Sequence, residues 1–168
     1  MASAVGVIKG YWGRLMLLVA GYWVLAMLGL SMALPGTNAT PVWPPAGVAL
    51  AALMLGGYRF VPGIFLGAWL TNLTQLTHVQ DFGFAFLNSV PVAAGNTAEA
   101  LIAYSLLVKV SRSGGRWFDS IRFAVVFPFS CLCGALVAAS VATYTLSAVA
   151  HQAGMLRFFA TWMFGDAT

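Results

Sequence analysis

Two of the four acidic residues in this sequence lie inside apolar stretches. Glu99 falls within one such stretch about ten residues before Lys109, and Asp166 lies about nine residues into the last one. An acidic side chain near the centre of a bilayer costs roughly 2.5–3.5 kcal/mol on insertion scales. We therefore expect both carboxyl groups to face the interior of a helix bundle, protonated or paired. The alternative role for Glu99 is that of a protonated side chain that only cross-links helices.

Amide side chains gather around Glu99 in the expected helices. Asn96 precedes Glu99 by three residues and so shares its helical face, while Asn72 and Gln75 share a face of the preceding helix. Taken singly, each amide would serve to hold membrane helices together at about 0.6 kcal/mol. Taken together with nearby aromatic and acidic groups, they predict a polar cavity that binds a ligand. The candidate ligand-binding residues are Trp43, Asn72, Asn96, Glu99, Trp162 and Asp166.

Other kinds of chemistry have no support in the sequence. It contains no P-loop, dinucleotide fingerprint or HExxH pattern, and no nucleophile has a visible base beside it. Cys131 and Cys133 are two residues apart on an expected helix, so their side chains point to different faces. His78 and His151 are both expected near the outer surface, and nothing directs them toward a shared metal or haem. We expect no enzyme activity, cofactor or metal site in this chain.

Composition indicates a membrane protein. Of the 168 residues, 7% are charged and 61% are hydrophobic, whereas about a quarter of the residues of a soluble domain are charged. The net charge of +4 comes from basic residues scattered between apolar runs, which indicates membrane orientation and not binding to nucleic acid. Since one span needs about 20 apolar residues, we predict one all-α integral membrane domain over residues 1–168. It is a polytopic helical bundle embedded in the lipid bilayer.

Prolines and glycines divide the chain into helices. Pro44 and Pro45 lie within the long uncharged run from Leu15 to Tyr58, where they are expected to begin a new helix because the first turn tolerates proline. Pro91 is expected to kink a long helix. Gly63 and Gly67 have the spacing that lets two helices approach closely, either inside the bundle or in a homodimer. The sequence predicts about five complete spans, near 12–34, 45–58, 61–79, 82–108 and 123–148, and the start of a sixth after 156.

Basic residues indicate the orientation in the membrane. If the N-terminus is cytoplasmic, seven Lys and Arg residues lie inside and only Arg157 lies outside. Cytoplasmic loops are enriched in such residues, so we expect a cytoplasmic N-terminus. The link before Trp43, the link at His78–Asp81 and His151 would then face outward, which in a bacterium is the periplasm.

Four sequence strings occur in an order that resembles one family. They are WPPAGVALAALMLGGYRFVPGIFLGAWLTNL (43–73), GNTAEALIAYSLL (95–107), FDSIRFAVVF (118–127) and WMFGDAT (162–168). The chain resembles the integral membrane-associated sensor domains of class one, the MASE type. The resemblance implies an input domain of about eight helices in the bacterial inner membrane. It also implies that the characteristic positions of the family fall on Trp43, Pro44, Pro45, Asn72, Asn96, Glu99, Trp162 and Asp166.

The resemblance further implies a cytoplasmic effector, such as a histidine kinase or a diguanylate cyclase of cyclic-di-GMP signalling. Members of the family continue past the GDA motif, so we expect this chain to be a fragment whose further helices and effector lie beyond residue 168. The expected function is detection of a small molecule or membrane state and its relay to that effector. Because such effectors act as dimers, a homodimer is plausible by analogy. A small transporter or substrate-binding subunit, and a plain membrane anchor, are the alternatives.

Overall fold

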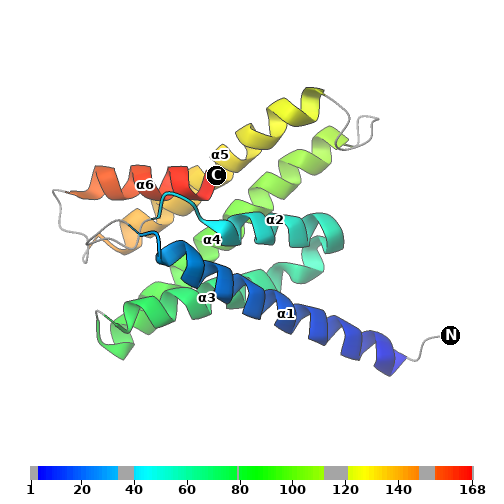
Figure 1. The fold of residues 1–168 in the computed structure, drawn as a ribbon, viewed down its shortest axis with the longest axis horizontal. Helices are drawn as coiled ribbons and strands as arrows, with labels where there is room; N and C mark the ends of the chain where they lie inside the picture. The colour runs from blue at the N-terminus through cyan, green and yellow to red at the C-terminus, as the bar shows by residue number, and fades with distance from the viewer. Residues whose placement is uncertain (1–3, 34–39, 79, 112–120, 148–153, 168) are drawn as a thin grey trace.

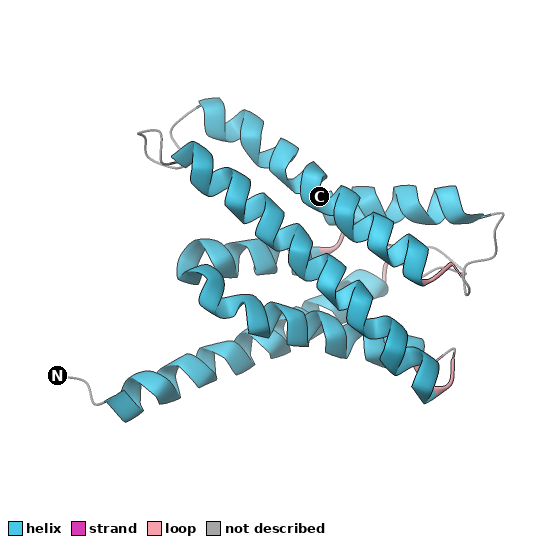
Figure 2. Cartoon of the chain, turned by 180° about the vertical axis from the view of Figure 1, so that it is seen from behind, coloured by secondary structure: helices cyan, strands magenta, loops and turns pink. Residues whose placement is uncertain are grey.

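Helices make up nearly all of the described chain (Figures 1 and 2). The computed structural model describes residues 4–33, 40–78, 80–111, 121–147 and 154–167, and no strand occurs in these ranges. The predicted all-α fold is therefore confirmed, and His151 lies outside the described residues. The helices are α1 (Ala4–Leu30), α2 (Pro44–Gly56), α3 (Val61–Leu76), α4 (Phe82–Ser111), α5 (Ile121–Thr145) and α6 (Met155–Ala167), and a short 3₁₀ turn, η1 (Gly57–Phe60), joins α2 to α3.

Three helical stretches of the described chain are long and apolar enough to cross a membrane. They cover 10–30, 44–76 and 121–145. The stretch 44–76 is not one straight span, because the chain reverses direction between α2 and α3 (Figures 1 and 2). At 13 residues, α2 is only about 20 Å long, which is less than the ~30 Å apolar thickness of a bilayer. The count of about five complete spans stays a prediction.

The local sequence explains where α2 starts and where the chain turns back. Pro44 and Pro45 occupy the first positions of α2, as predicted. Gly57 ends the helix with φ 69°, and its backbone N–H donates to the Leu53 carbonyl oxygen. A positive φ is easy for glycine and strained for most other residues. The turn therefore depends on Gly57, while the prolines fix the point at which the helix begins.

Helix α1 packs against α3 across the two glycines with close-approach spacing. A Cβ atom added at Gly67 would lie 2.8 Å from the Cβ of Tyr22, and one at Gly63 would lie 3.1 Å from Leu18. Both glycines are buried. Of the two alternatives, packing inside the bundle is therefore correct. The homodimer contact through this face is wrong, because α1 already covers it.

Small residues also bring α4 and α5 together. Five alanine or glycine residues on α5, together with Ser130, are buried, and a Cβ atom at Gly134 would lie 2.6 Å from the backbone oxygen of Glu99. Close helix contact in membranes is favoured by this kind of surface. Pro91 lies inside α4, which continues past it to Ser111. The kink at Pro91 stays a prediction.

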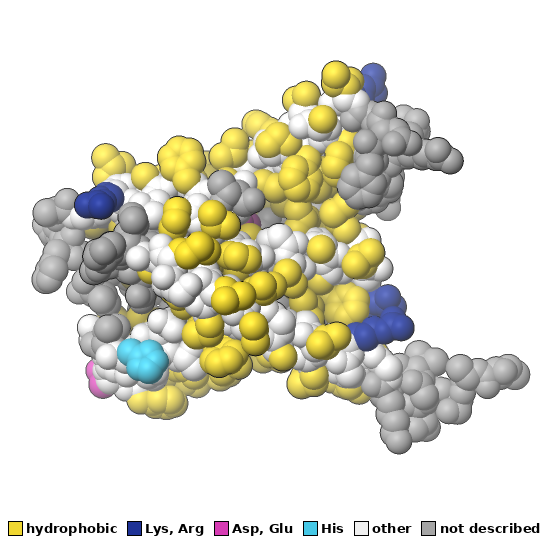
Figure 3. All heavy atoms as spheres, viewed as in Figure 1, with side chains coloured by type: hydrophobic (Ala, Val, Ile, Leu, Met, Phe, Trp, Pro, Cys, Tyr) yellow, Lys and Arg dark blue, Asp and Glu magenta, His cyan; other side chains and the backbone are white. Residues whose placement is uncertain are grey.

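Hydrophobic side chains are spread over the face of the bundle drawn in Figure 3, and the Lys and Arg side chains visible there lie at its margins. Leu17, Leu55 and Leu136 are among many large hydrophobic side chains that are exposed, Leu55 by 87%. Such a surface is unfavourable in water and suits contact with lipid tails. Many hydroxyl groups along the helices donate to carbonyl oxygens of their own helix, as Thr97 does to Ala93. The described chain is therefore built as a membrane domain.

Candidate functional site

A short non-helical segment, Thr40 to Trp43, is docked on the end of α6. The backbone N–H of Trp43 donates to the Gly165 carbonyl oxygen at 2.9 Å, and a Cβ atom at Gly165 would collide with the backbone oxygen of Thr40. The Thr40 hydroxyl donates to the Val42 carbonyl oxygen at 2.9 Å. Non-helical backbone inside a membrane is tolerated only where protein or a cavity covers it. Helix α6 supplies that cover, and Gly165 is the residue that permits the contact.

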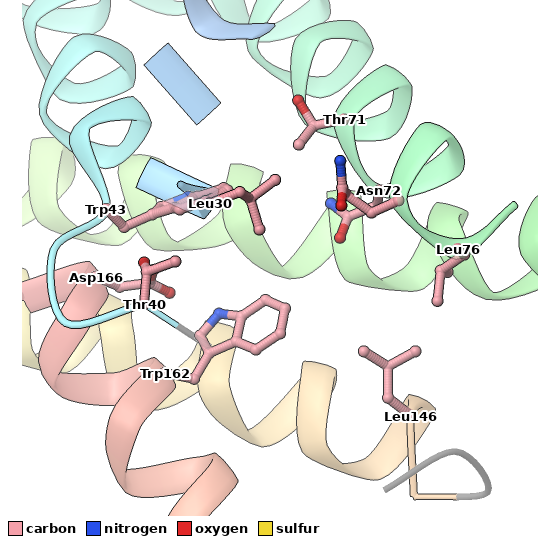
Figure 4. A pocket seen from close by; sticks show the side chains of 10 residues that line it. Leu30, Thr40, Trp43, Thr71, Asn72, Leu76, Leu146, Trp162 and Asp166 are labelled. Carbon is pink, nitrogen blue, oxygen red and sulfur yellow. The ribbon is translucent and has the colours of Figure 1, made fainter. Parts of the chain in front are cut away.

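A cavity lies beside this docked segment (Figure 4). Its volume is about 30 Å³, which exceeds the ~10–15 Å³ that one water molecule needs. The Trp162 indole nitrogen is turned toward Thr40 and Asp166 (Figure 4). We call it the tryptophan cavity; its lining residues are Leu30, Thr40, Trp43, Thr71, Asn72, Gln75, Leu76, Leu146, Trp162 and Asp166. The cavity therefore draws on helices α1, α3 and α6, on the docked segment and on Leu146, which directly follows α5.

Asp166 also forms the wall of a second hollow, which contains Glu99. This hollow lies between α2, α4, α5 and α6, has a volume of about 70 Å³ and includes Gly47 and Cys131 in its lining. Glu99 and Asp166 are both buried, both line this hollow, and their carboxyl groups are close enough to interact electrostatically. A hydrogen bond between two carboxyl groups requires a proton on one of them. Asp166 lines both hollows, and its interaction with Glu99 links α6 to α4.

Several buried polar atoms near the carboxyl pair have no hydrogen-bond partner among the described residues. They are Asp166 Oδ2, the indole nitrogens of Trp43 and Trp162, and both amide atoms of Asn96. The Tyr22 hydroxyl lies near Trp43 and Asn96, but the geometry of a hydrogen bond is not met. Buried polar groups are normally paired, and each unpaired one costs about 1–3 kcal/mol. Unpaired groups at this density are typical of a site that receives a polar ligand or water.

The predicted site residues lie close to one another but do not all line the same cavity. Trp43, Asn72, Trp162 and Asp166 line the tryptophan cavity, while Glu99 lines the second hollow. Asn96 is buried near Tyr22 and lines neither hollow. Sequence reasoning did not select Thr40, Thr71 or Tyr22. For Thr40 a signal existed, since it lies next to the proline-rich turn; Tyr22 is one aromatic residue among many in an apolar run.

Metal binding finds no support in the described part of the chain. No group of three or more His, Cys, Asp or Glu side chains lies close enough together there to hold a metal ion. The linings of the two hollows combine the two carboxyl groups with amides, hydroxyl groups, aromatic rings, aliphatic side chains and the Cys131 thiol. The site therefore has the composition of a binding site for a small polar molecule.

The fold and the site define an integral membrane helical domain with a buried carboxyl pair, which is a form suited to sensing within the bilayer. The family model MASE1 matches residues 14–168. The chain therefore belongs to the MASE1 family, whose members are membrane sensor input domains. A comparison with curated proteins gives no match, and a comparison with solved structures gives none either.

Replacing Gly165 by alanine should undock α6 from the segment Thr40 to Trp43. The added methyl group would collide with the Thr40 carbonyl oxygen, and overpacking of this kind costs typically 1–3 kcal/mol. The expected result is a midpoint of thermal unfolding lowered by several degrees. Gly47→Ala is the matched control, because a Cβ atom at Gly47 meets nothing within 4 Å. Equal midpoints for the two variants would show that the docking contact is absent.

Proposed function

We propose that this domain detects a small molecule or a change in the membrane and relays it to a cytoplasmic effector. The observation that supports this best is the position of Asp166. It lies beside the docked segment, lines both hollows and meets Glu99 of α4. A ligand that contacts Asp166 would therefore act on several helices at once. Membership of the MASE1 family supports the sensory role, and a histidine kinase or a diguanylate cyclase is the effector that we propose.

The relay would work through the docking of α6. A ligand shifts an equilibrium between two arrangements only if it binds one of them better. An occupied tryptophan cavity would favour the docked arrangement, because the ligand would contact both Trp43 of the docked segment and Trp162 of α6. The undocked arrangement separates these residues and has no such site. The position of α6 would then be the signal that the effector receives.

We place the domain in the inner membrane of a bacterium with its N-terminus in the cytoplasm. Arg59 lies in the turn between α2 and α3, and Lys109 lies in the last turn of α4. The turn between α2 and α3 and the end of α4 lie on the same side of the bundle as the start of α1 (Figure 1). The tryptophan cavity is nearer the opposite end, where α3 and α5 finish. On this orientation the cavity faces the periplasm and the effector faces the cytoplasm.

A transporter or substrate-binding subunit is the second candidate, and the short helix α2 favours it. Broken helices that end near the middle of the membrane, beside ionisable groups, are typical of transporters. Here α2 begins at the docked segment and contributes Gly47 to the hollow that holds Glu99. Uptake of a solute by liposomes that contain the protein would favour transport over sensing. A signalling response without any uptake would favour the sensory function.

Glu99→Gln should change the signalling response of the full-length protein. The substitution keeps the size of the side chain but removes its ability to share a proton with Asp166. We expect the response of effector activity to stimulus to fall at least tenfold, measured as kinase autophosphorylation or cyclic-di-GMP synthesis. Asp81→Asn is the control, because Asp81 is exposed at the start of α4. An unchanged response in Glu99→Gln would contradict the proposed role of the pair.

Cysteine labelling from outside the cell tests the orientation. In a background without Cys131 and Cys133, an impermeant maleimide should label a cysteine at His78 and leave one at Tyr58 unlabelled. Tyr58 lies in the turn before α3 and His78 lies just after α3, and both side chains are exposed. A difference in labelling would therefore report the side of the membrane and not burial within the protein. After membrane permeabilisation, both should react. The reverse pattern in intact cells would contradict a cytoplasmic N-terminus.

A further inference from the structure

The tryptophan cavity has the composition of a site for a positively charged group. Asp166 is 94% buried there, and its Oδ2 has no hydrogen-bond partner among the described residues. Asn72 donates its amide N–H to the Ala68 carbonyl oxygen at 2.8 Å, so its amide oxygen remains free to accept. Gln75 is half-buried at the same wall. The cavity thus offers one carboxyl oxygen and amide oxygens as acceptors.

Two indole side chains complete the same cavity. Trp43 and Trp162 each line it and are each 9% exposed. Tryptophan is the aromatic residue that attracts cations best, by about 0.5–2 kcal/mol depending on how far the cation is desolvated. The buried Asp166 carboxyl group makes the cavity better suited to an ammonium group than to an anion, and the two indole side chains close the cavity around it.

Charge balance also favours a cation. None of the ten residues that line the cavity is Lys, Arg or His. A carboxylate at this depth is costly unless a positive charge or a proton neutralises it. Within the site that the structure describes, Glu99 can supply a proton, but no side chain supplies a positive charge. A cationic ligand would supply it from outside.

The size of the cavity limits the ligand. About 30 Å³ accepts a small head group and is far below the ~300–1,000 Å³ of pockets for drug-sized molecules. We propose that the tryptophan cavity binds the ammonium group of a small amine, with Asp166 as its counter-ion. This inference rests on the proposed sensory function and names the chemical class of its signal. The amide oxygen of Asn72 is the second acceptor for the ammonium group.

Thermal unfolding of the full-length protein in lipid nanodiscs at neutral pH tests the proposal. The probes are ethylammonium chloride, ethanol as the uncharged molecule of equal size, and sodium chloride at matched ionic strength. A ligand that binds only the folded state raises the unfolding midpoint in proportion to its occupancy. We expect a saturable rise with ethylammonium and none with the other two. Equal effects of all three probes would overturn the proposal, and so would no effect of any.

Variants of the lining residues test whether ethylammonium binds in the tryptophan cavity or elsewhere on the protein. Asp166→Asn should weaken ethylammonium binding at least tenfold, and Asn72→Ala should weaken it severalfold. Asp81→Asn should leave binding unchanged, because that carboxyl group is exposed outside the cavity. If Asp166→Asn does not fold, Asn72→Ala decides, since its side chain bonds only within α3. If the variants that fold, Asp166→Asn and Asn72→Ala, bind ethylammonium as well as the native protein does, the tryptophan cavity is not the binding site.

The outcome is independent of the test of the sensory role. Binding of ethylammonium without any effector response to amines or other stimuli would retain the site and contradict the sensory function. A response abolished by Glu99→Gln, in a protein that does not bind ethylammonium, would retain the sensory function and overturn the amine site.

Discussion

The hydrogen bond from the Trp43 backbone N–H to the Gly165 carbonyl oxygen connects two parts of the chain that are far apart in sequence. Lipid offers no hydrogen-bond partners, so any backbone that leaves the helical conformation within the membrane must find them in the protein. Pro44 and Pro45 force such a break before α2. The end of α6 supplies the missing partner, and Asp166 reaches the interior as a consequence.

The same contact explains why the site contains unpaired polar groups. Once α6 is docked, Asp166 lies against Glu99, while Trp43 and Trp162 border one cavity. Many hydroxyl groups of the described helices instead bond within their own helix, as Thr97 does to Ala93. Self-contained bonding makes the rest of the bundle suitable for lipid. Around Asp166, by contrast, the Asp166 carboxyl oxygen, two indole nitrogens and the Asn96 amide are buried without partners, which concentrates a capacity for ligand binding there.

The sequence predicted the helices, the start of α2 and the inward position of both acidic residues, because apolar runs, prolines and the cost of burying charge act locally. The sequence did not predict which helix each glycine packs against. Gly67 and Gly134 have similar sequence contexts, yet one contacts Tyr22 of α1 and the other contacts Glu99 of α4. It also could not show that two hollows flank Asp166, since the packing of several helices decides this.

A double-mutant cycle between Glu99 and Asp166 tests the central claim that the two carboxyl groups form one unit. The unfolding free energies of the native full-length protein, Glu99→Gln, Asp166→Asn and the double variant would be measured in lipid nanodiscs. Groups in direct contact show coupling energies of about 0.5–3 kcal/mol, whereas distant groups add within about 0.3–0.5 kcal/mol. We predict a coupling energy of at least ~1 kcal/mol. Additive effects would contradict the pairing, and with it the account of how α6 is held.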